Sequence, residues 1–267
     1  MMTRRHTLGL AAAGLAAALP RAGAAQDAAS GTAQTAFGPI PVPGGPMTLT
    51  PVEHASLTLT LPELAIAVDP VGDPARFGTP DLILVTHEHG DHFDPETLPA
   101  LMGEQTRLIT NPAVFDKLPQ ELKARAKAMT NGERRDEGGL DIEAVPAYNT
   151  TPERQQYHPR GRDNGYVLTL GESRLYIAGD TEDTPEMRAL TGISLALLPM
   201  NLPYTQTPEQ AAAAVEAFRP QVAVPYHHRG TDPAEFAARV AALGVPVTVV
   251  IADWYPGSDD PTGGRPN

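Results

Sequence analysis

Three histidines and an aspartate lie within six consecutive positions of the chain: His87, His89, Asp91 and His92. His87 and His89 are two residues apart, so on extended backbone their imidazoles point to the same side and can bind one metal ion. Asp91 and His92 are adjacent, and a carboxylate beside an imidazole can reach a second ion. This spacing therefore indicates a site for two metal ions within one short loop.

A strand is expected directly before this loop. The apolar run Leu82–Val85 is typical of a strand that is buried on both faces, which would hold the loop rigidly. A second predicted strand, Arg174–Ala178, ends in a similar way, with Gly179 followed by Asp180. A carboxylate placed like this at a strand end is a candidate for the same site, and a solvated turn aspartate is the alternative.

The spacing His-x-His-x-Asp-His resembles the signature of the metallo-β-lactamase superfamily. The resemblance implies an α/β fold of the metallo-β-lactamase type, a four-layer αββα sandwich. It makes Asp180 the carboxylate that bridges two ions, and it makes His227, just past the predicted strand Val222–Pro225, a further ligand. His228 is the next candidate, but neighbours on extended backbone point to opposite faces, so we do not expect both to bind the same ion.

Two more residues follow from the resemblance. Asp69 is expected to orient a metal-binding histidine, because a carboxylate that accepts a hydrogen bond from an imidazole fixes its tautomer. His54 lies at an early turn that is near the metal site in this superfamily. A loop histidine without a role is an equal alternative for His54.

The third ligand of the first ion is ambiguous in the sequence. The superfamily usually places a histidine after the strand that corresponds to Leu140–Ala147, and Asn149 stands there instead. An amide oxygen is a weaker donor for zinc than an imidazole. His158, nine positions later, could fold back to complete the site or contact the substrate. This arrangement resembles one branch of the superfamily, metal-dependent hydrolases related to a bacterial lactonase that opens a phosphorylated ascorbate lactone.

Apolar strands alternate with helices along the chain, which predicts an α/β architecture. Besides those already named, the expected strands are Met47–Val52, Ala55–Leu61, Leu64–Val68, Arg107–Thr110, Gly165–Leu170, Ser194–Met200 and Val245–Ile251. The expected helices are Pro95–Met102, one that starts at Asn111, Leu118–Met129, Thr184–Leu190, Thr207–Phe218 and Asp232–Leu243.

The first 24 residues have the features of a twin-arginine signal peptide. Arg4 and Arg5 precede the short apolar stretch Leu8–Leu19, and small residues follow at 22–24. We expect cleavage and export of a folded protein to the periplasm or the medium of a bacterium. A membrane anchor is the alternative, but the stretch is short for a bilayer. The remaining boundaries are a flexible leader at 25–46, one hydrolase domain at 47–258 and a tail at 259–267.

The composition restricts the partners and the chemistry. The formal net charge is −12 at pH 7, and a surface of that sign repels nucleic acid and anionic lipid, so we expect no nucleic-acid partner and no stable membrane span. The chain has no cysteine, which excludes disulfides, thiolate ligands and a cysteine nucleophile. Any metal must therefore be bound through nitrogen and oxygen.

The expected cofactor is a pair of divalent ions, zinc first, with Mn²⁺ or Fe²⁺ as alternatives. Two such ions would lower the pKa of a shared water from about 15.7 to about 7 and provide hydroxide at neutral pH. Hydroxide would attack a carbonyl or phosphoryl centre, and Asp91 or Asp180 could accept and return the proton. The sequence therefore predicts a metal-dependent hydrolase.

The expected substrate is a lactone or other ester of a small, anionic molecule, with a phosphodiester as the next choice. Arg160, Arg162 and Arg229 lie beside predicted ligands and could bind carboxylate or phosphate, or could be surface arginines paired with acids. Two rival functions are a periplasmic metal-binding protein without turnover and a di-iron oxidoreductase of the same fold. The oxidoreductases tend to have a glutamate where this chain has His89, which favours hydrolysis.

Overall fold

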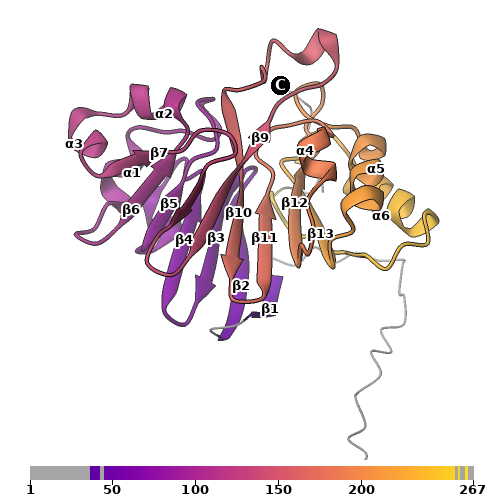
Figure 1. Ribbon diagram of the computed structural model, residues 1–267, viewed down its shortest axis with the longest axis horizontal. Coiled ribbons are helices and arrows are strands. Elements are labelled where there is room, and N and C mark those ends of the chain that lie inside the picture. The colour runs from indigo at the N-terminus through magenta and orange to yellow at the C-terminus, as the bar shows by residue number, and fades with distance from the viewer. Residues whose placement is uncertain (1–36, 43–44, 256–257, 259–261, 264–267) are drawn as a thin grey trace, which may run out of the picture. The chain divides into compact units, whose positions relative to one another are not determined.

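The computed structural model describes residues 37–42, 45–255, 258 and 262–263, all within one compact unit that spans residues 33–267. Two seven-stranded sheets pack face to face, and helices cover the outer face of each sheet (Figure 1). The predicted four-layer αββα sandwich is confirmed. The predicted signal peptide, residues 1–24, lies outside the described residues.

The strands of the first sheet lie side by side in the order of the sequence, as an antiparallel meander followed by parallel strands. They are β1 (Phe37–Val42), β2 (Gly45–Glu53), β3 (Ser56–Leu61), β4 (Leu64–Val68), β5 (Leu82–Leu84), β6 (Arg107–Thr110) and β7 (Ala126–Ala128). The helical segments of this half are η1 (Pro74–Phe77), α1 (Thr97–Leu101), α2 (Pro112–Lys117) and α3 (Gln120–Lys123).

The second sheet repeats this topology, with antiparallel strands first and parallel strands after them. Its strands are β8 (Arg134–Asp136), β9 (Asp141–Ala147), β10 (Asp163–Leu170), β11 (Ser173–Ile177), β12 (Leu195–Pro199), β13 (Val222–Tyr226) and β14 (Thr248–Val249). Its helical segments are η2 (Pro152–Arg154), α4 (Pro185–Arg188), α5 (Pro208–Phe218) and α6 (Pro233–Ala242).

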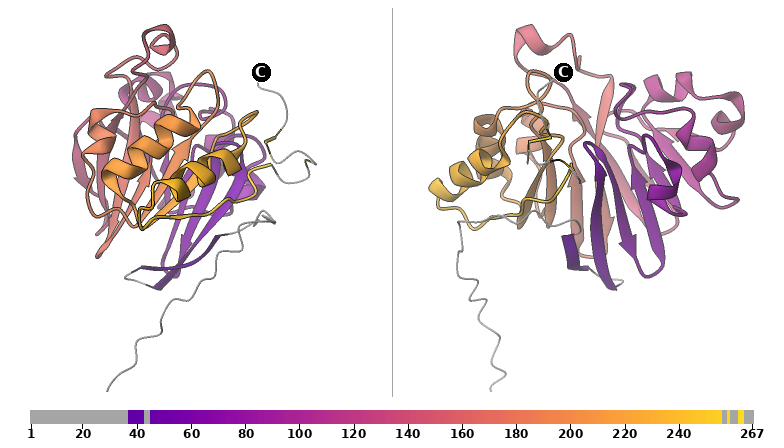
Figure 2. Two further views of the ribbon diagram at one scale, coloured as in Figure 1. Left: turned by 90° about the vertical axis from the view of Figure 1, so that its right-hand side faces the viewer. Right: turned by 180° about the vertical axis from the view of Figure 1, so that it is seen from behind.

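Three apolar clusters separate the four layers, and Figure 2 shows the layers from the side and from behind. The largest cluster lies between the sheets, and each of the other two lies between one sheet and its helices. Alternate residues of the strand segment before the metal loop enter different clusters. Leu82 and Leu84 face the other sheet, whereas Ile83 and Val85 face the helices of the first half. Burial on both faces, as predicted, fixes the strand from which the metal loop starts.

One predicted helix is wrong in its second half. Within Leu118–Met129, helix α3 ends at Lys123, and Ala126–Ala128 forms strand β7 in parallel with β6. Backbone pairing with the free edge of the first sheet outweighs the weak local preference for a helix. Among the described residues, none of the helices is long and apolar enough to cross a membrane.

Both ends of the folded unit extend beyond the sequence prediction. Strand β1 lies inside the predicted flexible leader at 25–46 and pairs antiparallel with β2. In the predicted tail, the carbonyl of Thr262 accepts a hydrogen bond from the backbone N–H of Gly230 at 2.8 Å. Gly263 approaches the ring of Tyr255 so closely that an added Cβ atom would lie 2.6 Å from it. Part of the tail therefore packs against the domain.

The strand ends of the two sheets bring distant segments together. In the first sheet, β4 leads into Asp69 and β5 leads into the metal loop. In the second sheet, β11 leads into Asp180 and β13 into His227. Since β4 and β5 are parallel neighbours, and β12 lies parallel between β11 and β13, the carboxyl ends within each sheet share an edge.

Candidate metal centre

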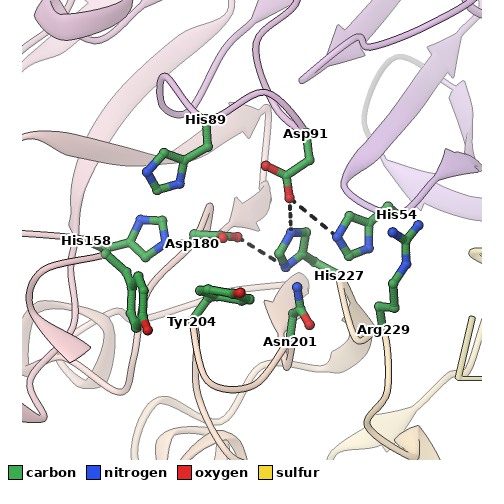
Figure 3. A pocket seen from close by; sticks show the side chains of 10 residues that line it. His54, His89, Asp91, His158, Asp180, Asn201, Tyr204, His227 and Arg229 are labelled. Carbon is green, nitrogen blue, oxygen red and sulfur yellow. Dashed lines mark hydrogen bonds and ion pairs between the residues drawn. The ribbon is translucent and has the colours of Figure 1, made fainter. Parts of the chain in front are cut away.

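The predicted ligands converge at one cavity of about 470 Å³ at this edge of the sandwich (Figure 3). Its lining comes from loops that connect the strands of both sheets. The lining residues are His54, His89, Asp91, Tyr157, His158, Asp180, Asn201, Tyr204, His227 and Arg229. Ligand-type side chains that are far apart in the sequence therefore share one opening to solvent.

The first cluster consists of His87, His89 and His158, whose ligand nitrogens all lie within 4.8 Å of one another. His87 Nε2 and His89 Nδ1 are 3.2 Å apart, as expected for two imidazoles on the same side of an extended segment. The ring of His158 stands roughly edge-on to both, with centroid distances of 4.9 and 4.8 Å. Three imidazoles thus surround one position that suits a metal ion.

The geometry favours His158 over Asn149 as the third member of this cluster. His158 is buried, and its Nδ1 lies 3.0 Å from Asp163 Oδ2, which leaves Nε2 directed at the cluster. The Asn149 side-chain N–H groups donate to the carbonyls of Arg154, at 3.1 Å, and Tyr204, at 2.6 Å. Asn149 therefore ties two loops together.

The second cluster consists of His54, Asp91 and His227, again within 4.8 Å. Asp91 Oδ2 lies 3.1 Å from His227 Nε2 and 3.5 Å from His54 Nε2, and the two imidazoles stack with their centroids 3.9 Å apart. His54 Nδ1 contacts the hydroxyl of Tyr255 at 2.8 Å, so Nε2 is left for the cluster. His92 Nε2 lies 3.2 Å from His227 Nε2 and borders the same position.

Asp180 lies between the two clusters, and each of its oxygens faces one of them. Oδ2 is 3.4 Å from His158 Nε2 and 3.9 Å from His87 Nε2. Oδ1 is 3.4 Å from both His92 Nε2 and His227 Nδ1. The side chain of Asp180 is only 3% exposed, so this carboxylate is buried among imidazoles. Such a carboxylate has the geometry of a bridge between two cations.

A second buried carboxylate lies behind His92. Asp69 Oδ2 is 2.8 Å from His92 Nδ1, so His92 is oriented with Nε2 toward the clusters. Asp69 also accepts hydrogen bonds from the backbone N–H of Thr86 and from its hydroxyl, each at 2.7 Å. Asp69 thus connects the end of β4 to the start of the metal loop.

Several residues of the site have strained backbone. His54, Asp69 and His227 have φ angles of 55°, 45° and 46°, in a region that side-chain-bearing residues seldom adopt. Strain of this kind persists where surrounding structure holds it, and it gathers at functional sites. Gly179, with φ of 64°, precedes Asp180, and an added Cβ atom there would lie 2.8 Å from the carbonyl oxygen of Asn164. Only glycine fits at that position.

The protonation states suit metal binding. Burial alone would raise the pKa of Asp180, but His227 and His92 hold it well below its usual range. Burial lowers the pKa of His87 well below its ordinary value and that of His54 to about 3. Burial of His92 is outweighed by Asp180 and other carboxylates, which raise its pKa to about 10. Asp163 and Asp180 likewise outweigh burial and raise the pKa of His158. Ionised carboxylates and neutral imidazoles are the ligand forms, so a bound cation would displace the protons of His92 and His158.

Buried polar atoms without partners support a cation at this place. Among the described residues, His158 Nε2, Asp180 Oδ1 and His227 Nδ1 are buried and make no hydrogen bond. Buried polar atoms are nearly always paired, so three unpaired atoms around Asp180, one in the first cluster and two facing the second, indicate missing partners. All the nearby donors are nitrogen or oxygen, and a divalent ion would satisfy them.

The other candidate residues have different surroundings. His228 is buried against the ring of Tyr255 and belongs to neither cluster, and burial lowers its pKa to about 4. Arg160 pairs with Glu186 at the surface. Arg162 binds Asp163, and so holds the carboxylate that orients His158. Of the three predicted anion-binding arginines, Arg229 alone lines the cavity.

Sequence reasoning missed four polar residues of the site. Asn201 lies two residues beyond the end of β12, and the rule that led to Asp180 would have found it. Tyr157, Tyr204 and Tyr255 lie in loops, and nothing in their spacing indicates that they contact the site.

Known proteins with similar sequences are metal-dependent hydrolases. Residues 48–227 match the family model described as the beta-lactamase superfamily domain. A UPF0173 metal-dependent hydrolase from Methanopyrus kandleri is 32% identical over 232 residues, which cover 78% of this chain and 97% of that protein. The chain belongs to the metallo-β-lactamase superfamily. A hydrolase of the same group from Thermus thermophilus is 33% identical, over 72% of this chain and 90% of its own length.

Solved structures agree with this assignment. A metal-dependent hydrolase from Parabacteroides distasonis has a TM-score of 0.71 at 45% identity, covering 76% of this chain and 92% of that one. A diiron β-hydroxylase from Streptomyces venezuelae has a TM-score of 0.60 at 18% identity, covering 79% and 54%, and this shows the fold alone. The protein is a metal-dependent hydrolase of the metallo-β-lactamase fold.

Proposed function

We propose that this superfamily member binds two divalent ions and hydrolyses a lactone or other ester of a small molecule. The observation that carries the proposal is the position of Asp180, whose two oxygens face two separate clusters of ligands. Imidazole and carboxylate donors without sulfur suit zinc first, with Mn²⁺ or Fe²⁺ as alternatives. Ions held there would activate water as the nucleophile for hydrolysis.

The two aspartates would have different tasks. The side chain of Asp91 is 46% exposed and lines the cavity, whereas that of Asp180 is 3% exposed and faces imidazoles on both sides. Asp91 can therefore reach both water and substrate, and it would accept a proton during attack and return it to the leaving group. Asp180 would keep the two clusters at a fixed separation. His92, His227 and His54 lie 3.9, 3.1 and 3.5 Å from Asp91 Oδ2 and lower the pKa of Asp91, so its carboxylate stays ionised.

The size of the cavity supports a small substrate. About 470 Å³ lies within the usual range for small-molecule sites and is too small for a folded macromolecule. A phosphoester of a small molecule is the second candidate. The position of Asp180 between two clusters suits this substrate equally well, because pairs of metal ions also serve in phosphoester hydrolysis.

We also propose that the enzyme is exported through the twin-arginine route to the periplasm or the medium. The support is the order of Arg4, Arg5, a short apolar stretch and small residues in the first 24 positions. Replacing Arg4 and Arg5 by lysines should leave the precursor in the cytoplasm. Normal export of that variant, measured by cell fractionation, would contradict the proposed route.

The hydrolase proposal is tested by elemental analysis of the purified protein, followed by screening of the metal-loaded form against lactones, esters and phosphoesters. We expect two ions per chain and turnover of at least one carboxylic ester or lactone. Bound metal without turnover on any of these classes would favour a metal-binding protein, and iron with redox activity would favour an oxidoreductase. An Asp116→Ala variant removes an exposed carboxylate far from the site in the sequence. It should keep the same metal content as the wild type after purification, and so serves as the control for metal lost during purification.

A further inference from the structure

The three arginines near the site differ in their partners. Arg160 contacts Glu186 at 2.8 Å, and Arg162 binds the carboxylate of Asp163 through two nitrogens, at 2.7 and 2.9 Å. Arg229 lines the cavity, and within the part of the chain that the structure describes it forms no ion pair with a carboxylate. In a protein with a net charge of −12, an unpaired guanidinium at a cavity is a binding group for an anion.

A contact with the ring of Tyr255 holds Arg229 beside the second cluster. Its guanidinium carbon lies 5.6 Å from the ring centroid of Tyr255, within the range of a cation–π contact. The hydroxyl of Tyr255 contacts His54 Nδ1 at 2.8 Å, so one ring positions both the arginine and a member of the cluster. Figure 3 shows the guanidinium of Arg229 next to His54.

Asn201 supplies a second polar group on the same wall of the cavity. It is 7% exposed, and its Oδ1 is buried without a hydrogen-bond partner. Figure 3 shows Asn201 between Tyr204 and Arg229, below His227. Because a buried carbonyl oxygen without a donor is unfavourable, Asn201 is suited to accept a hydrogen bond from a bound molecule.

We propose that Arg229 and Asn201 form a binding subsite for a small organic acid. The guanidinium would bind a carboxylate or phosphate group through two parallel hydrogen bonds, and Asn201 would accept a hydrogen bond from a hydroxyl or amide group of the same molecule. The role of this subsite in substrate binding rests on the proposed hydrolase function, because the anion would be part of the substrate. The subsite itself requires binding only, so it can be tested without turnover.

The test is calorimetric titration of the metal-loaded full chain with succinate and with inorganic phosphate. Arg229→Gln should weaken binding of the preferred anion about ten- to a hundredfold, because it removes a charged bidentate donor. Arg229→Lys keeps the charge without the fork and should give an intermediate loss. Arg160→Gln removes an arginine that is paired at the surface and should leave the affinity unchanged. Metal content and melting temperature are compared first, so that all variants are folded and loaded.

Each outcome decides a point. Tighter binding of succinate assigns a carboxylate to the subsite, and tighter binding of phosphate assigns a phosphate group. Equal affinity in the wild type and Arg229→Gln would mean that the metal ions alone hold the anion, and it would overturn the proposal, as would no binding of either probe to the wild type. Anion binding that depends on Arg229 in a protein that hydrolyses no ester would sink the proposed function and leave the subsite intact.

Discussion

The two ligand clusters are held in different ways. In the first, His87 and His89 come from one extended segment, and His158 comes from the loop between β9 and β10. In the second, His54, Asp91 and His227 come from three distant parts of the chain. The second cluster depends on strand ends, left-handed backbone and stacked rings, whereas the first depends on a loop. The first should therefore be the easier of the two to empty selectively.

The loop that carries His158 is fixed by a buried acid close to the bridging position. Glu182, two residues after Asp180, accepts hydrogen bonds from the backbone N–H groups of Thr150, at 2.8 Å, and Thr151, at 2.6 Å. It also pairs with Arg154 at 3.0 Å. The segment with the bridging carboxylate thus holds the loop that completes the first cluster, and the two features are linked through the backbone.

The largest effect is expected at Asp180, because both clusters share it. Asp180→Ala should reduce the bound metal below one ion per chain and abolish hydrolysis, which elemental analysis and activity assays would show. An active variant that retains two ions would remove Asp180 from the site.

Loss of His158 should separate the clusters. His158→Ala removes one of three imidazoles from the first cluster and none from the second, so the stoichiometry should fall from two ions to one, with activity lower by about a hundredfold or more. Gln156→Ala, an exposed residue of the same loop, is the matched control and should keep both ions. Unchanged stoichiometry in His158→Ala would assign the third ligand elsewhere.

A smaller effect is expected at Glu182, which acts on the first cluster through the loop. Glu182→Gln should lower the affinity of the first cluster for its ion by about tenfold while the second ion stays bound. It should also lower the free energy of unfolding at pH 7 by roughly 1–3 kcal/mol. Cobalt substitution would show the change as an altered absorption spectrum of one site. An equal loss of both ions would mean that Glu182 only stabilises the fold.

The same residue predicts a pH dependence. Hydrogen bonds from Thr151 and Thr150 outweigh burial and lower the pKa of Glu182 in the folded protein. A lowered pKa contributes stability above the pKa of the unfolded chain, about 4.3, and that contribution is lost as pH falls through the folded pKa. The difference in melting temperature between wild type and Glu182→Gln should therefore shrink from pH 7 to pH 3. A constant difference would argue that the charge of Glu182 does not matter.

A similar loss of metal affinity, without a loss of stability, is expected at His54. His54→Phe keeps a ring to stack on His227 but removes Nε2, and Asp91, His92 and His227 still border the position. The second ion should bind about tenfold more weakly, with the first unaffected, in competition titrations against a chelator. A change confined to the first ion would reverse the assignment of His54.

Local spacing predicted the parts of the site that strands present. Leu82–Val85 reads as a buried strand that ends in the metal loop, and Arg174–Ala178 reads as a strand that ends beside Asp180, so both segments were candidates from local pattern. The family resemblance, not the pattern, joined the two segments into one site. Contacts between loops are not encoded locally. The choice between Asn149 and His158 depended on how a loop folds back, and Glu182 and Tyr255 carry no periodic signal.

The difference between local patterns and contacts with distant segments also explains the misassigned segments. Two segments form strands because an edge of the sheet is available to pair with them: Ala126–Ala128 and Phe37–Val42. Neither segment has a residue pattern that predicts a strand. Helix α5, in contrast, begins where predicted. Thr207 and Gln210 form a capping box around Pro208, and such caps are complete within four residues.

The most direct test is a crystal structure of the protein loaded with zinc, with anomalous scattering measured on both sides of the zinc edge. The account predicts two ions, one among His87, His89 and His158 and the other among His54, Asp91, His92 and His227, each within about 2.0–2.2 Å of its ligands, with one oxygen of Asp180 on each. A single ion, or two ions of which neither contacts Asp180, would contradict it.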